Sequence, residues 1–236
     1  MMRREKIVYS LFLIVTVALS STVAFLYVGY QDSQRSIERE SLQTISNQAY
    51  FISLDIYDLV SRFNHAHSKI HDDDYQLAQG YISNETRDAL YWRTFDDYLG
   101  DFRQRGDTFE TEMNNFYYLL GEPTHETYEN ISDTIRYAVA QVDFARTTRT
   151  QNESHRLMDE LYNILGISEQ DGNWTGMNGI AGSFSEMYVY WHALTNPYPG
   201  TSTTQPSVMF EWAVGNATRM YQDLLVWHEN NPISYP

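Results

Sequence analysis

The chain has 236 residues, no cysteine and a formal net charge of −15 at pH 7. This length is sufficient for one domain with a hydrophobic core. The lack of cysteine excludes disulfide bonds, thiolate metal sites and thiol nucleophiles. The acidic balance, with no basic patch beyond the first six residues, argues against nucleic acid as a partner.

The basic residues are almost all arginine, because Lys6 and Lys69 are the only lysines. An acidic chain with so little lysine is typical of proteins from salt-loving archaea. Their carboxylates keep the surface hydrated in brine, and the salt screens the repulsion between them. An ordinary acidic secreted domain is the alternative. We interpret the composition as halophilic and archaeal.

The first expected element is a transmembrane helix over residues 7–30. The chain from Ile7 to Gln31 carries no charged side chain and is mostly apolar. About 20 apolar residues are enough to cross the hydrocarbon core of a bilayer. A cleaved signal peptide, with Ala24 as its cleavage point, is the alternative, but its apolar region would span only about 7–15 residues. The run therefore favours an uncleaved signal-anchor.

The flanks of this run predict its orientation. Arg3, Arg4 and Lys6 precede it, and such basic residues stay on the cytoplasmic side. Residues 1–6 are therefore expected in the cytoplasm. The acidic domain, residues 31–236, is expected outside the cell membrane, as the extracytoplasmic part of a single-pass protein.

Small side chains recur every four residues within the expected anchor, at Thr16, Ser20 and Ala24. This spacing puts them on one helix face and permits close packing against a second membrane helix. The expected outside domain also contains sequons of the Asn-x-Ser/Thr type, at Asn84, Asn130, Asn152, Asn173 and Asn216. They predict a glycosylated surface protein.

A stripe of apolar residues separated alternately by three and four positions follows the anchor. Its members are Leu42, Ile45, Ala49, Ile52, Ile56, Leu59, Phe63, Ala66 and Ile70. The spacing predicts one long helix that continues the anchor to about Asp72. Because the flanking positions are not rich in opposite charges, we expect an intramolecular bundle seam rather than a homodimeric coiled coil.

Helical spacing continues through the rest of the chain. It predicts helices over residues 74–105, 108–120, 124–145, 157–165, 179–194 and 206–227. The first of these is expected to break near Ser83-Asn84 and to end at Gly106. No alternation typical of strands occurs. The expected fold is all-α: the transmembrane helix continues into an extracytoplasmic antiparallel bundle of about four main helices plus short ones.

The densest group of potential metal ligands lies near the end of the first helix. His67 and His71 are four residues apart, so they share a helix face, and Asp72 follows them. These three residues are the candidate metal ligands. The His-Glu-x-x-His pattern is absent and no third ligand is identifiable, so we expect a solvated helix end rather than a metal site. No cofactor is predicted.

No nucleophile motif occurs, so we do not expect an enzyme. We expect a membrane-anchored structural or interaction protein of the cell surface, an accessory subunit of an envelope or membrane complex in a halophilic archaeon. Its partners would be the lipid bilayer and other membrane or surface proteins. The alternative is an extracytoplasmic ligand-sensing bundle that signals through a membrane partner. That architecture is similar to the periplasmic half of chemoreceptors and sensor kinases, without a matching family motif.

Overall fold

The computed structural model describes the backbone of residues 2–120, 125–147, 151–167, 175–195 and 204–231. Side chains are described for the same residues, with the exception of 2–15, 17, 18, 95, 125–128, 146, 147 and 151. The chain divides into two compact units, Met1–Thr44 and Ile45–Pro236.

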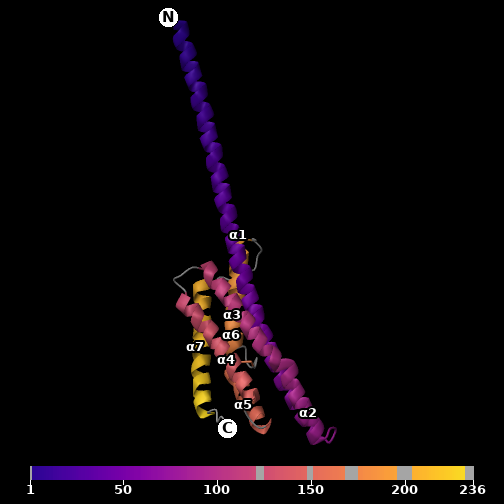
Figure 1. The fold of residues 1–236 in the computed structure, drawn as a ribbon. Coiled ribbons are helices and arrows are strands. Elements are labelled where there is room, and N and C mark those ends of the chain that lie inside the picture. Colours follow the sequence, from indigo (N-terminus) through magenta and orange to yellow (C-terminus); the bar gives the residue numbers. More distant parts are fainter. Residues whose placement is uncertain (1, 121–124, 148–150, 168–174, 196–203, 232–236) are drawn as a thin grey trace. The chain divides into compact units, whose positions relative to one another are not determined.

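All regular elements among the described residues are helical, which confirms the predicted class (Figure 1). They are α1 (Met2–Ala78), α2 (Asn84–Thr94), the π-helix η1 (Phe95–Leu99), α3 (Gly100–Leu120), α4 (His125–Thr147), α5 (Gln151–Ile164), α6 (Gly176–Thr195) and α7 (Pro206–Asn230).

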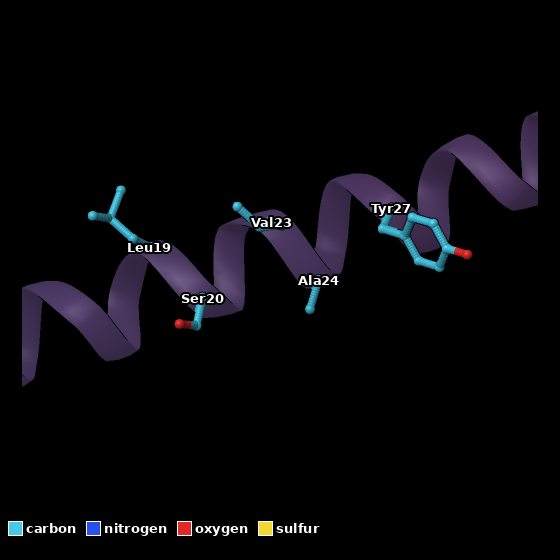
Figure 2. A pocket seen from close by; sticks show the side chains of 5 residues that line it. All are labelled: Leu19, Ser20, Val23, Ala24 and Tyr27. Atoms are coloured by element: carbon cyan, nitrogen blue, oxygen red, sulfur yellow. The ribbon is translucent and has the colours of Figure 1, made fainter.

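Residues 2–44 of α1 form the first unit. Every side chain from Leu19 to Ser41 is exposed in it. Among the residues with described side chains, no helix combines the length and the apolar character needed to cross a membrane. Much of the anchor expected over residues 7–30 lies outside that set. In Figure 2, Ser20 and Ala24 point to one side of α1, away from Leu19 and Val23.

The remaining part of α1 contributes one side of the core in the second unit. Its fully or almost fully buried apolar residues are Ala49, Ile52, Ile56, Leu59, Phe63, Ala66 and Ile70. They are seven of the nine members of the predicted stripe, and they pack against apolar residues of the same chain. Of the other two members, Ile45 is partly buried against this core and Leu42 is half-buried. The stripe is therefore the seam of an intramolecular bundle.

The other helices complete this core. Helices α3 and α4 pack together, and α7 packs against both α4 and α6. Hydrogen bonds connect α1 to two other helices, α3 and α6. The Gln48 amide donates to the carbonyl oxygen of Glu112 on α3 at 3.2 Å, and the Ser46 hydroxyl donates to the carbonyl oxygen of Tyr188 on α6 at 3.3 Å.

Two predicted helix boundaries differ in their outcome. The break near Ser83-Asn84 is present, and the Ser83 hydroxyl accepts a hydrogen bond from the Thr86 backbone N–H at 3.2 Å, which caps α2. The predicted end at Gly106 is wrong, because α3 runs through it. Gly106 is buried, and a Cβ there would lie 2.8 Å from Cγ2 of Val139. This glycine serves the packing of α3 against α4.

A pair of glycines brings the end of α5 to the start of α6. Gly166 and Gly176 have φ values of 63° and 54°, in the left-handed region that favours glycine. A Cβ on Gly166 would lie 2.5 Å from the Thr175 carbonyl oxygen, and one on Gly176 would lie 2.4 Å from that of Leu165. The Met177 N–H donates to the Leu165 carbonyl oxygen at 2.9 Å, which joins the two backbones.

Candidate metal centre

Helices α1 and α5 bring two histidines and one carboxylate together. His67 and His71 lie one turn apart on α1, and Asp159 faces them from α5. Nε2 of His67 and Nε2 of His71 lie 2.8 and 2.9 Å from Oδ1 of Asp159, and 3.3 Å from each other. One potential ligand atom from each residue thus lies within 4.8 Å of the other two. We call these three residues the His–Asp cluster.

The spacing of these atoms fits a common metal ion. Zinc binds imidazole nitrogen and carboxylate oxygen at about 2.0–2.2 Å, so two ligands of a tetrahedral ion lie about 3.3 Å apart. The three separations in the cluster, from 2.8 to 3.3 Å, are equal to this value or slightly shorter. An outward shift of the side chains by a few tenths of an ångström is enough to admit the ion.

The pKa shifts of His67 and Asp159 favour the forms of these groups that bind a cation. Burial is the largest influence on the His67 imidazole and lowers its pKa, although the hydrogen bond to Asp159 opposes this effect. Burial acts to raise the pKa of Asp159, but the hydrogen bonds from His71 and His67 outweigh it and bring the pKa below its usual value. A neutral imidazole and an ionised carboxylate are the forms that bind metals.

Tyr162, one turn after Asp159 on α5, fixes the position of the His67 ring. The two rings are stacked, with 4.1 Å between their centres. The Tyr162 hydroxyl donates to Oδ1 of Asn64 on α1 at 3.2 Å. The ring stack and the hydroxyl hydrogen bond both hold the Tyr162 side chain, so the His67 ring has little freedom to turn away from the cluster.

The third candidate from the sequence, Asp72, lies outside the cluster. Its side chain is 56% exposed, and its carboxylate accepts a hydrogen bond from Nε2 of Gln76 at 2.8 Å. Asp159 takes its place, at a separation of 88 residues from His71. No local pattern in the sequence joins these two residues. The one available signal is His155, which precedes Asp159 by four residues and repeats the spacing of His67 and His71.

The sequons lie in different environments. Asn84, Asn130 and Asn152 are exposed on α2, α4 and α5. Asn216 is buried in α7, and its side-chain amide donates to the Trp212 carbonyl oxygen at 3.0 Å. This burial argues against a glycan at Asn216 in the folded chain. Asn173 lies outside the described residues.

The donor set indicates the class of ion. Imidazole suits zinc, copper, iron and nickel, whereas magnesium and calcium prefer oxygen ligands alone.

No protein-family model, curated protein or solved structure matches the chain. The function is therefore inferred from the residues themselves. Two imidazoles and one carboxylate on two helices could hold a divalent transition metal.

Proposed function

We propose that the chain is a membrane-anchored surface protein whose helical domain binds one divalent transition-metal ion of the zinc type. The ligands are His67, His71 and Asp159. The observation that carries the proposal is the convergence of their three ligand atoms from two helices within 4.8 Å. The membrane part is supported by the uncharged run over residues 7–30 and its basic flank.

An ion bound by the cluster would link α1 to α5, because these two helices supply its ligands. Because the cluster does not exist in the unfolded chain, the ion would bind the folded state alone. Its binding free energy then adds to stability, by about 2.7 kcal/mol at a free metal concentration 100 times the Kd. The proposed role is thus the stabilisation of the domain by metal.

The test is metal binding by the full chain in detergent and high salt, after EDTA treatment and removal of the chelator. Calorimetric titration with zinc is expected to show one site per chain, and thermal unfolding is expected to shift upward with zinc but not with magnesium. His67→Ala and Asp159→Asn should abolish both effects.

Two matched controls lie on the same helix as the histidine ligands. His65→Ala removes an exposed histidine whose ring lies 4.7 Å from that of Tyr98, and Asp72→Asn removes an exposed carboxylate outside the cluster. Both variants should bind zinc as the parent does. Absence of zinc binding by the parent, or equal binding by all variants, would overturn the proposal.

A second candidate function is that of an accessory subunit in a membrane or surface complex, with another envelope protein as partner. The supporting observation is the exposure of large apolar side chains in residues 45–236. Phe51 on α1 is 51% exposed, and Trp212 and Val226 on α7 are 54% and 57% exposed. Purification from native membranes in mild detergent should give a particle larger than the monomer. A lone monomer counts against this function.

A further inference from the structure

A further histidine, His155, lies next to the His–Asp cluster, one turn before Asp159 on α5. We infer that His155 is the fourth protein ligand of the ion, which makes the site a closed centre of three imidazoles and one carboxylate. This inference rests on the proposed binding of a transition metal at the cluster.

The first supporting observation is the distance between the rings. Two imidazoles bound through Nε2 to one tetrahedral zinc ion have ring centres about 5 Å apart, given metal–nitrogen bonds of about 2.0–2.1 Å. The ring centres of His67 and His71 lie 4.5 Å apart. Those of His71 and His155 lie 4.8 Å apart. The ring of His155 thus lies about as far from the ring of His71 as the ring of His67 does.

The second observation concerns the two nitrogens of His155. Nδ1 lies 3.0 Å from Oδ2 of Asp74, and this carboxylate favours the tautomer with the proton on Nδ1. The lone pair is then on Nε2, which is buried and has no hydrogen-bond partner among the described residues. Buried polar atoms in proteins rarely stay unpaired. A metal ion at the cluster supplies the missing partner.

Asp74 and His155 also form the arrangement that proteins use behind a metal ligand. A ligating histidine commonly donates its other ring N–H to a carboxylate, which fixes its tautomer and its orientation. Asp74 in turn forms an ion pair with Arg87, whose Nε lies 3.4 Å from Oδ1 of Asp74. The ligand, its carboxylate and the supporting cation come from α5, α1 and α2 respectively.

His155 lies outside the tight group of three ligand atoms, so its ring must move toward the ion when the metal binds. His155 and Asp159 share one face of α5 in the same way as His67 and His71 share one face of α1. The proposal therefore requires a rotation of the His155 side chain that brings Nε2 toward the cluster while Nδ1 stays near Asp74. Four protein ligands leave no position for water, which is typical of structural rather than catalytic zinc sites.

The decisive measurement is the number of imidazoles around the metal in the full chain. X-ray absorption of the zinc-loaded protein should show three imidazoles and one oxygen ligand. The cobalt-loaded protein should show the intense visible bands of a four-coordinate ion. Both spectra are taken on the parent protein, so they do not depend on whether a variant folds.

Variants give an independent readout by zinc titration against a competing chelator. His155→Ala should weaken zinc binding by about 100-fold or more, and Asp74→Asn by about tenfold, since the latter acts through His155. His228→Ala is the matched control. Like His155, His228 is half-buried, and it is far from the cluster in the sequence; its Nδ1 lies 2.8 Å from Oε1 of Gln141. It should bind zinc as the parent does.

The outcomes separate the two proposals. If the parent binds zinc with two imidazoles, and His155→Ala binds it as tightly as the parent, the fourth ligand is overturned while the metal site stands. If the parent binds no transition metal, the proposed function itself fails. Three imidazoles in the parent, together with weaker binding by His155→Ala, establish the closed centre.

Discussion

The rings of His67 and Tyr162 lie nearly parallel, with 15° between their planes and 4.1 Å between their centres. One ring belongs to α1 and the other to α5. The stack therefore joins the two helices at the His–Asp cluster and fixes the orientation of the His67 ring, a proposed ligand. Preset ligands bind more tightly, because less side-chain freedom is lost on binding.

Replacement of this tyrosine should weaken metal binding without removing a ligand. We expect Tyr162→Leu to lower zinc affinity by about tenfold, in the range known for residues that orient metal ligands. Tyr98→Leu is the control, since Tyr98 contacts His65, a histidine outside the cluster. Competition titration against a chelator measures both. Equal loss of affinity in the two variants would show that the stack has no orienting role.

The two glycines of α3 should respond in opposite directions to alanine. A Cβ on Gly106 meets Val139 at 2.8 Å, whereas a Cβ on Gly100 meets nothing within 4 Å. Gly106→Ala should destabilise the domain by about 1–3 kcal/mol through overpacking. Gly100→Ala should stabilise it by about 0.5–1 kcal/mol, because alanine favours the helix. Denaturant unfolding gives both values, and equal effects would contradict the packing role of Gly106.

The free energy of unfolding of the metal-free protein should include a contribution that increases with pH. Burial is the largest influence on both His67 and His155, and it lowers the pKa of each below its usual value. Between the folded and the unfolded pKa, the unfolded chain binds more protons. The contribution is therefore complete above the unfolded pKa of about 6.5 and decreases as the pH falls below it.

The double variant His67→Gln, His155→Gln isolates this part. The comparison is needed because the net charge of −15 adds a pH dependence of the opposite sign, through self-repulsion that weakens toward the pI of about 4.7. In EDTA, the free energy of unfolding of the parent relative to the double variant should increase from about pH 5 to about pH 7. A constant difference would mean that neither imidazole is buried in its neutral form.

Glycan mapping should separate the sequons by burial. Protein from its native source is expected to carry glycans at Asn84, Asn130 and Asn152, which are exposed, and none at Asn216, which is buried in α7. Mass spectrometry of proteolytic peptides measures the occupancy of each. A glycan on Asn216 would require α7 to leave its place in the core.

The helices of this chain were predictable because their signal is local. The three-four stripe of α1 needs only neighbours in sequence, and Pro206 lies in the first turn of α7 as predicted. The prediction at Gly106 was wrong because this glycine makes room for Val139, which is 33 residues away on another helix. A glycine that ends a helix and one that admits a neighbouring helix look alike in sequence.

The proposed metal ligands divide in the same way. His67 and His71 were predictable as a pair because four residues bring two side chains to one helix face. Asp72 directly follows His71, and one residue on a helix turns the side chain by about 100°, so it cannot share that face. Asp159 lies on another helix, and only the packing of α5 against α1 shows that it belongs with them.

The junction of Gly166 and Gly176 has a practical consequence for protein engineering. The hydrogen bond from the Met177 N–H to the Leu165 carbonyl oxygen fastens the end of α5 to the start of α6. The closure of a loop costs only about 0.6 kcal/mol more for each doubling of its length. Because this junction is made by residues 165 and 177, a peptide epitope inserted between residues 167 and 175 should leave the contact of α5 with α6 and the proposed metal ligands in place.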